Sequence, residues 1–597
     1  MARKKKQSTE FIPSKYQKAI FDYIGGASGH LVVSAAAGSG KSSTLIKSLE
    51  SIPSDKKILL SAFNRDIVSD LKKKTKGIDN VDVMTLHGLG LSMLKRNYPT
   101  NSLIPEPFKY EAHIKNNIRF YTSINTYSLG GKNYFRYLDN IKKYVDFGRF
   151  YLCQTSKDLD FIEARYGIET IADEKDVAIK VMNWGKTELD SVDYTDMIWL
   201  PHVLYLKPIG LLYDFIMIDE CQDLNKAERE LVLKCFKMGT RLVAVGDENQ
   251  SIYSFSGADP ESFKVLKSLP NTECLPLSIS YRCPKNIVEF AQKLVPSIEW
   301  NEVNTNYGEI KYDVPLSDVQ DGDMILCRNN APLVQVYTEF LKLGKKAFIR
   351  GKDVGANLKT LVKSIRQEKI NADCMEDGLF VRLYDDLFVT RNNIMQRSGV
   401  DAKTAMTSPI IENKLDMIKA LEILSEGIST ATELIAKIDE IFPKKDKKEG
   451  IALSTIHKAK GLEANNVYIV CNSLMPSASA KKDWEITQEH NLMYVAYTRA
   501  KNILGFIDEK DFKDFNLKDT TSQAKLDRIE TQVNKVLGKT TKTIINENTA
   551  KEIIDNAQKI NIKEIMPARK TVDINTRRTV NSFADLFSNK RKVKARR

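Results

Sequence analysis

The sequence predicts an α/β protein with two parallel β-sheet cores that are interrupted by two mainly helical insertions. Two observations predict this fold class. Short apolar runs that end in polar residues recur along the chain with helical patterns between them, and this alternation is typical of parallel sheets. Two long stretches, residues 95–190 and 356–446, break the alternation and show helical periodicity without comparable strands.

Eight apolar runs are expected to form buried strands. Because a strand buried on both faces reads as a continuous apolar run, each run can sit inside a covered sheet. In chain order they are "HLVVS" (30–34), "KILLSAF" (57–63), "VDVMTLH" (81–87), "YDFIMIDE" (213–220), "RLVAVGDE" (241–248), "GDMILCRN" (322–329), "GIALSTIH" (450–457) and "NNVYIVCN" (465–472).

The order of these elements predicts five parts. A tail follows the second core, with an amphipathic helix on Leu526, Ile529, Val533 and Val536, a capping box at Thr549 and Glu552, and a basic end. The expected parts are the first core (1–94 and 191–280), the first insertion (95–190), the second core (281–355 and 447–513), the short second insertion (356–446) and a helical, basic, partly disordered tail (514–597).

The composition favours a polyanionic partner. The 597 residues include 90 Lys and Arg against 77 Asp and Glu, a formal net charge of +13, although a lysine-rich surface can also be inert. The eight cysteines lack metal-ligand spacing, which indicates reduced thiols in an intracellular protein. No run approaches the roughly 18 apolar residues of a membrane helix, and "MARKKKQSTE" lacks the apolar segment of a signal peptide. We therefore expect a soluble, cytoplasmic protein with no membrane contact.

The stretch "SAAAGSGKSSTL" (34–45) predicts a phosphate-binding loop between a strand and a helix. Lys41 would reach the terminal phosphates and the Ser42 hydroxyl would bind Mg²⁺. The general pattern opens with glycine, whereas alanine stands there in this chain, and a plain Gly/Ser loop is the alternative reading. The residues expected to contact the nucleotide are Ala35, Ala36, Ala37, Gly38, Ser39, Gly40, Lys41, Ser42 and Ser43.

A pair of carboxylates follows the strand "YDFIMI" in "DECQD" (219–223). The carboxyl ends of neighbouring parallel strands meet at one edge of a sheet, so these side chains should face the phosphate loop. Asp219 is expected to hold Mg²⁺ through water and Glu220 to polarise the attacking water, which is the division of labour that ATP hydrolysis needs.

Two arginines of the second core are candidate arginine fingers. Arg282 lies in "SYRCP" (280–284) and Arg499 follows the apolar strip of "YVAYTRAK" (494–501). Facing the first core, they would stabilise the charge of the transition state, and hydrolysis would depend on closure between the two cores. Ordinary surface ion pairs are the alternative, and Arg328 is expected to be structural.

Taken in order, the segments resemble the UvrD/Rep/PcrA-like helicases of superfamily 1. Alanine at the first position of the phosphate loop is usual in that family, and the likeness covers roughly residues 12–510. The segment "NLMYVAYTRAK" is closer to the F-box helicase branch and its bacterial and viral relatives. The segments are "PSKYQKAI", "AAAGSGKS", "SAFNRD", "TLHGL", "DYTDM", "DECQD", "VGDENQSIYSFSGA", "LSISYRCP", "STIHKAKGLE" and "EHNLMYVAYTRAK".

The resemblance implies RecA-like motor domains of the P-loop NTPase type and further site residues. Gln17 would read adenine, Tyr281 would stack on it and Glu463 would lie near the ribose. Gln250 would sense the γ-phosphate, and Gln222 would couple the nucleotide site to the DNA path. The residues implied to contact nucleic acid are Phe63 (a core phenylalanine is an even alternative), Thr85, His87, Tyr253, Phe255 and His457.

The resemblance also implies the activity. ATP with Mg²⁺ would drive 3′ to 5′ movement along single-stranded DNA and unwinding of tailed duplex DNA. A translocase that strips proteins without unwinding, and a DNA-binding scaffold with a dead ATP site, are the alternatives. Three departures from the family pattern stand out. Ser256 lies where many relatives carry arginine, His490 and Asn491 replace a common Arg-Arg pair, and the second insertion is short. We expect a monomer in a bacterial or phage-infected cell, or in the nucleus of a eukaryotic host, with a tail that could dock a protein partner.

Overall fold

The structure is a computed structural model that describes residues 11–62, 65–371, 374–442, 449–508, 510 and 520–538. The chain divides into a compact unit, residues 1–537, and a second unit, residues 538–597, of which only the first residue is described. The predicted capping box at Thr549 and the basic end of the tail therefore lie outside the described residues.

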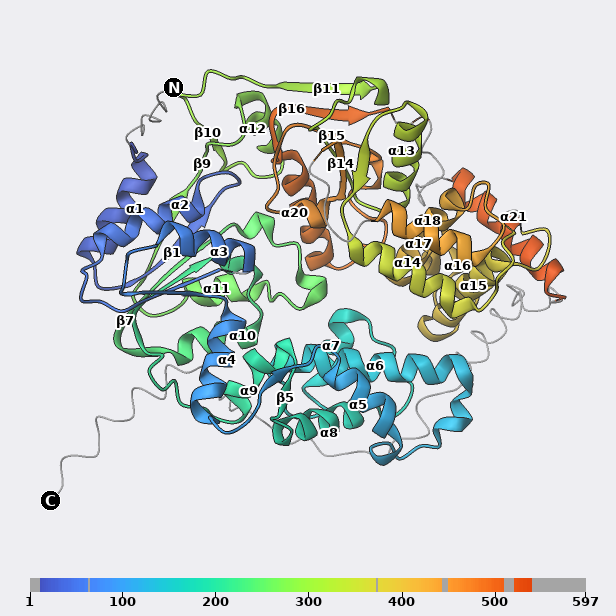
Figure 1. The fold of residues 1–597 in the computed structure, drawn as a ribbon, viewed down its shortest axis with the longest axis horizontal. Helices are drawn as coiled ribbons and strands as arrows, with labels where there is room; N and C mark the ends of the chain where they lie inside the picture. Colours follow the sequence, from blue (N-terminus) through green and yellow to red (C-terminus); the bar gives the residue numbers. More distant parts are fainter. Residues whose placement is uncertain are drawn as a thin grey trace, which may run out of the picture. The chain divides into compact units, whose positions relative to one another are not determined.

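The first core is a six-stranded, all-parallel sheet with strand order β3-β2-β6-β7-β1-β8 (Figure 1). All five runs predicted for this part of the chain form strands. The edge strand β8 was not predicted, because its residues are mostly exposed and include Pro276. The strands are β1 (His30–Ala35), β2 (Ile58–Ser61), β3 (Val81–Met84), β6 (Tyr213–Asp219), β7 (Phe236–Gly246) and β8 (Thr272–Leu277).

Helices cover both faces of this sheet, which is why its strands read as continuous apolar runs. Leu31 and Val33 of β1 pack with α1 (Lys15–Gly26), α2 (Lys41–Ser48) and α3 (Arg65–Lys74), whereas Val32 faces the opposite layer. That layer consists of α4 (Leu86–Asn97), α9 (Tyr194–Val203), α10 (Lys226–Lys234) and α11 (Glu261–Lys267).

The first insertion is helical, as predicted, and shares one apolar cluster with the second layer of the first core. A buried ionic network anchors it, because Arg149 of α6 donates to Asp193 (2.8 Å) and Asp196 (3.0 Å), and Lys109 of α5 also donates to Asp196 (2.8 Å). Its elements are β4 (Ile104–Pro105), α5 (Lys109–Asn117), α6 (Gly130–Phe150), α7 (Leu159–Tyr166), α8 (Glu174–Thr187) and β5 (Ser191–Val192).

The second core is another six-stranded parallel sheet, with strand order β11-β16-β15-β12-β14-β13. The three predicted strands form its centre. A separate pair, β9 (Ile279–Ser280) and β10 (Glu299–Trp300), precedes it. Its strands are β11 (Glu309–Val314), β12 (Met324–Cys327), β13 (Ala347–Ile349), β14 (Ile451–Thr455), β15 (Ala464–Ile469) and β16 (Ala500–Ile507); its helices are α12 (Lys285–Ala291), α13 (Ala331–Lys342), α19 (Ile456–Ala459) and α20 (Asp483–Tyr497).

The second insertion is also helical, as predicted, and a helix from beyond the second core completes it. Leu526 and Val533 of α21 are buried in its apolar cluster, and Glu530 accepts two hydrogen bonds from Arg391 of α15 (2.6 and 2.7 Å). The predicted amphipathic helix on these residues is therefore confirmed. The helices are α14 (Lys352–Ile365), α15 (Leu379–Ser398), α16 (Ala402–Met406), α17 (Pro409–Leu424), α18 (Ala431–Ile441) and α21 (Thr520–Val536).

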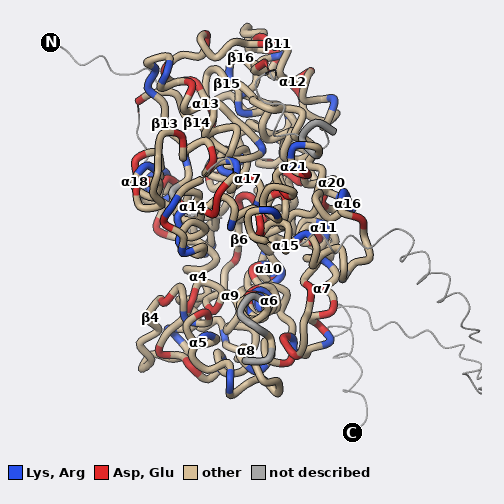
Figure 2. Tube along the Cα trace, turned by 90° about the vertical axis from the view of Figure 1, so that its right-hand side faces the viewer, with Lys and Arg blue, Asp and Glu red and all other residues tan. Residues whose placement is uncertain are grey.

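These elements confirm the predicted α/β class with two parallel sheets and two mainly helical insertions. Basic and acidic residues are interspersed along the described chain rather than segregated by element (Figure 2). Within the described residues, no helix is both long and apolar enough to span a membrane.

Candidate active site

The phosphate loop joins β1 to α2 and depends on two glycines. Gly38 (φ +72°) and Gly40 (φ +79°) adopt the left-handed conformation that side chains disfavour. A Cβ at Gly38 would also lie only 2.5 Å from the Cβ of Arg282. The segment around Arg282, which opens the second core, therefore packs directly on the loop. The buried hydroxyl of Ser39 has no hydrogen-bond partner among the described residues. The loop thus has the open backbone and the unpaired polar atom of an anion cradle.

Three carboxylates lie near the ammonium group of Lys41, those of Asp219 and Asp247 buried and that of Glu220 half-buried. Its Nζ lies 3.3 Å from Glu220 Oε1, and Asp219 accepts a hydrogen bond from the hydroxyl of Ser42. Burial alone would lower the pKa of Lys41, but Glu220, Asp247 and Asp219 raise it above its ordinary value. Three carboxylates near one lysine leave this part of the site with a net negative charge.

Asp219 and Glu220, the first two carboxylates of "DECQD", differ in proton affinity. Burial and the neighbouring Glu220 raise the pKa of Asp219 to about 6. Burial would also raise the pKa of Glu220, but Lys41 and Lys460 lower it to about 2, which leaves that carboxylate ionised. Glu220 is also one of the non-glycine residues with a left-handed backbone (φ +57°), a strained conformation that is concentrated at functional sites.

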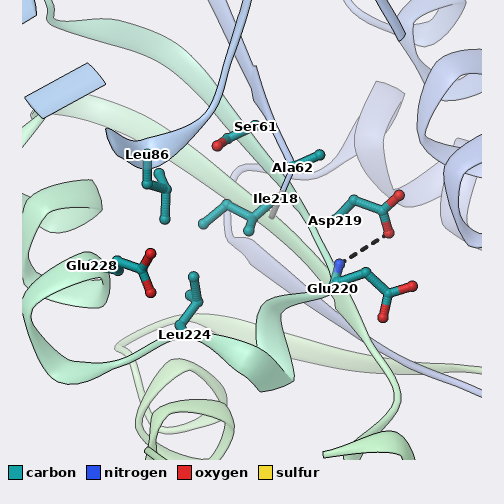
Figure 3. A pocket seen from close by; sticks show the side chains of 8 residues that line it. All are labelled: Ser61, Ala62, Leu86, Ile218, Asp219, Glu220, Leu224 and Glu228. Atoms are coloured by element: carbon teal, nitrogen blue, oxygen red, sulfur yellow. Dashed lines mark hydrogen bonds between the residues drawn. The ribbon is translucent and has the colours of Figure 1, made fainter. Parts of the chain in front are cut away.

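A small pocket lies behind these carboxylates. Figure 3 shows Asp219 and Glu220 on one side of it, Glu228 on the other, and Leu86, Ile218 and Leu224 between them. The backbone N–H of Glu220 donates to Asp219 (3.0 Å), the dashed contact in the same figure. This pocket belongs to the carboxyl edge of the first sheet, where ligands of open α/β sheets bind.

Gln222 links the ends of two neighbouring strands. Its Oε1 accepts a hydrogen bond from Asp247 N (2.9 Å), after β7, and its Nε2 donates to Glu220 Oε2 (2.6 Å), after β6. Asp223, the next residue, accepts a hydrogen bond from Lys460 of the second core. The predicted coupling residue therefore contacts the candidate base directly and lies beside a contact between the cores.

Arg499 of the second core reaches the first core. Its Nη2 donates to Gln250 Oε1 (3.2 Å) and its Nη1 to Leu462 O (3.3 Å). Burial and the nearby Arg282 lower the pKa of Arg499 to about 10. A fully buried guanidinium facing a second cation is poised to accept an anion.

Arg282 is paired differently from Arg499. Its Nε donates to Glu463 Oε2 (2.7 Å) and its Nη1 to Thr498 O (3.3 Å). Glu463, the residue implied for the ribose, also pairs with Lys501. Both predicted fingers thus lie at the junction of the two cores, where Arg282 is held by an ion pair with Glu463.

The structure brings the two residues implied for adenine together. The hydroxyl of Tyr281 lies 3.5 Å from Gln17 Oε1, and the Tyr281 residue is 42% exposed. Gln17 is buried and donates to Thr44 of α2 (3.1 Å), so it is fixed relative to the phosphate loop. The exposed ring of Tyr281 is suited to stack on an adenine base, and the buried amide of Gln17 beside it is suited to hydrogen-bond that base.

Three residues implied for nucleic acid form one cluster. Phe255, 50% exposed, packs edge-on against the ring of His457 (5.5 Å), and the Tyr253 hydroxyl donates to His457 O (3.1 Å). Burial, with Arg328 nearby, lowers the pKa of His457 to about 3, so its imidazole is neutral. Tyr166 of the first insertion donates to the carbonyl of Ser254 in the same loop (3.1 Å).

The other residues implied for nucleic acid lie apart from this cluster. The Thr85 side chain caps α4 by accepting from Gly88 N (3.1 Å), and His87 Nδ1 lies 3.7 Å from Glu228 Oε1. Thr85 and His87 are half-buried. Phe63 lies outside the described residues.

Comparisons with known proteins agree with this geometry. Residues 15–270 match the UvrD/REP helicase N-terminal domain, and residues 357–510 match the UvrD-like helicase C-terminal domain. The chain belongs to the UvrD/Rep-like helicase family. It is 22% identical over 618 residues to the ATP-dependent DNA helicase PcrA of Staphylococcus aureus, covering 80% of each chain, and 22% identical over 605 residues to that of Staphylococcus epidermidis, covering 80% of this chain and 81% of the relative.

Several contacts of this UvrD/Rep-like site involve residues that sequence reasoning missed. Asn491, noted only as a departure from relatives, is buried and donates to Glu248 O (3.1 Å) and Ser251 O (3.0 Å) of the first core. Tyr494 accepts a hydrogen bond from the phosphate loop. Arg328 pairs with Glu489 of α20 (2.9 Å), in line with the structural role expected for it. The spacing of Asn491 and Tyr494 by three residues, on one face of a helix, was the available signal.

Proposed function

We propose that this chain is an ATP-driven DNA helicase that moves 3′ to 5′ along single-stranded DNA and unwinds duplex DNA. The contact between Arg499 and Gln250 carries the proposal, because it brings a cation of the second core to the loop that follows β7 in the first core. Such a site is complete only when the cores are closed, and an ATPase of this kind converts each hydrolysis into a change of distance between two domains.

The side chains of the candidate site are suited to bind Mg²⁺ and a nucleoside triphosphate. Mg²⁺ is usually held by one or two carboxylates together with substrate phosphates, so Ser42 and Asp219 would suffice on the protein side. The glycine cradle and the unpaired Ser39 hydroxyl fit phosphate oxygens. When bound, Mg²⁺ would neutralise charge that develops on the phosphates.

Each polar residue of the site then has a task. Glu220, ionised, orients the attacking water, and Lys41 leaves Glu220 to contact the terminal phosphates. Arg499, with Gln250, stabilises the transferring group from the second core. Arg282 exchanges Glu463 for phosphate, which ties a break in one ion pair to the arrival of nucleotide.

The parts of the chain would divide this work as follows. The first core (1–94 and 191–280) and the second core (281–355 and 447–513) are the motor domains, and the insertions flank the DNA. Single-stranded DNA would cross both cores over Phe255 and His457, where each stacked base contributes roughly 1–3 kcal/mol. Thr85, His87 and Phe63 would complete that path on the first core. The 3′ to 5′ direction follows from the family alone.

ATPase and unwinding assays test the proposal. We expect ATP hydrolysis that single-stranded DNA stimulates strongly and added salt weakens, because phosphate contacts release counterions. Lys41→Ala should abolish hydrolysis and weaken nucleotide binding, whereas Glu220→Gln should keep binding and lose turnover. Lys47 is a half-exposed lysine of the same helix, and Lys47→Ala should change neither.

The DNA substrates separate the alternatives. A duplex with a 3′ tail should be unwound and one with a 5′ tail should not. Protein displacement without unwinding would instead identify a translocase, and an absence of DNA-stimulated ATP hydrolysis would leave a DNA-binding scaffold.

A further inference from the structure

One face of α20 docks onto the first core through backbone groups. Gln488, Asn491 and Tyr494 follow one another at intervals of three residues and point to the same side of the helix. Gln488 Oε1 accepts from Ser254 N (3.1 Å), and Asn491 holds two carbonyls on either side of Gln250. The helix that leads to Arg499 is therefore fixed to the loop that carries the γ-phosphate sensor.

Tyr494 extends this face to the phosphate loop itself. Its hydroxyl accepts a hydrogen bond from the backbone N–H of Ala37 (3.0 Å), and both residues are fully buried. Ala36 and Ala37 belong to the same apolar cluster as Tyr494 and the helices of the second core. The first half of the phosphate loop thus packs on the second core, while its second half opens α2 in the first.

We infer that Tyr494 is a positioning residue that sets the phosphate loop in register with Arg499. The hydroxyl and the guanidinium leave the same short segment of chain, five residues apart, and each contacts a different part of the nucleotide site. When the cores close, the hydrogen bond to Ala37 fixes the position of α20 relative to the phosphate loop. The position of α20 in turn determines where Arg499 lies. The inference rests on the proposed ATP hydrolysis and assigns a residue to it beyond the predicted set.

The variant Tyr494→Phe tests this inference, because it removes only the hydroxyl. We expect kcat on saturating single-stranded DNA to fall three- to tenfold, with DNA affinity and melting temperature close to wild type. Tyr497→Phe is the matched control, since Tyr497 lies on the same helix and its buried hydroxyl donates to Asn472 (3.3 Å), away from the first core. This control should retain wild-type kcat.

A double-variant cycle distinguishes positioning from general damage. If Tyr494 acts through Arg499, then Tyr494→Phe should have little further effect in an Arg499→Lys background, whereas independent effects would multiply. Asn491→Leu, which removes both loop contacts of that residue, should lower kcat in the same direction if the docking face acts as a unit.

The results of these tests distinguish a failure of the inference about Tyr494 from a failure of the proposed function. Wild-type kcat in Tyr494→Phe, or full multiplicativity with Arg499→Lys, would overturn the inference while leaving the ATPase intact. A wild-type chain without DNA-stimulated hydrolysis would instead refute the proposed function, and this is measured first. Equal losses in Tyr494→Phe and Tyr497→Phe would reduce the role to helix stability and would also overturn the inference.

Discussion

The buried carboxyl of Glu228 leads to a pH-dependent stability that one substitution should remove. Glu228 lies in the first turn of α10, where it exchanges capping hydrogen bonds with Asn225 (2.8 and 3.1 Å). Burial raises its pKa to about 7, against 4.5 for a free glutamate, with Asp223 adding to the shift. His87 is its other titratable neighbour. The folded chain therefore binds this proton more tightly than the unfolded chain does.

The sign and the size follow from that difference. The stability that Glu228 contributes in its protonated form is complete below about pH 4.5 and is lost as the pH rises through about 7. Each tenfold change in proton affinity is worth about 1.4 kcal/mol, so the full loss above pH 8 is about 3 kcal/mol. Glu228→Gln mimics the protonated carboxyl and can keep the capping bonds.

Thermal unfolding at two pH values checks this prediction. We expect Glu228→Gln to melt at the wild-type temperature at pH 5 and several degrees above the wild type at pH 8.5. Glu261→Gln, a solvent-exposed control on α11, should follow the wild type at both values. The same difference in melting temperature at pH 5 and pH 8.5 would refute the reasoning.

Two further predictions concern the insertions. Arg149→Met should destabilise the chain by about 3–5 kcal/mol, measured by chemical denaturation, because Asp193 and Asp196 lose their buried partner. Lys143 is a half-exposed lysine of the same helix, so Lys143→Met is the control, and equal destabilisation by both variants would contradict this explanation. Leu526→Asp should release α21 from the second insertion and speed limited proteolysis there at least tenfold, whereas Thr531→Asp, at an exposed position of the same helix, should not. Equal cleavage of the two variants would show that burial of Leu526 does not hold the helix.

The central strands of both sheets could be predicted from sequence because burial on two faces leaves a continuous apolar run. Of the four edge strands only β3 was predicted in this way, and the inner strand β16 was missed as well. β8 and β11 are half solvent-exposed, and residues such as Glu273 and Lys311 interrupt their apolar pattern. Their place is set by pairing with β1 and β16, which is information that lies elsewhere in the chain.

The candidate site shows the same limit. Local sequence patterns are enough to predict the chemistry of Lys41, Asp219 and Glu220 without knowledge of the fold. The structure brings these three residues together. Asn491 could be noted only as a departure, because its partners are backbone carbonyls more than 200 residues away. Arg282 was expected to face phosphate, and its ion pair with Glu463 depends on how the two cores meet.

The docking of α20 onto main-chain atoms bears on how such a chain can diverge. Four of its contacts bind an amide or carbonyl of the first core, as does Lys460 at the carbonyl of Gln250 (2.7 Å). Backbone groups persist whatever side chain they carry, so the first-core loop can accumulate substitutions without losing these bonds. For these bonds alone, the requirement for particular side chains falls on one stripe of a single helix and not on the side chains of that loop. An interface built in this way can persist in relatives that share only about a fifth of their residues.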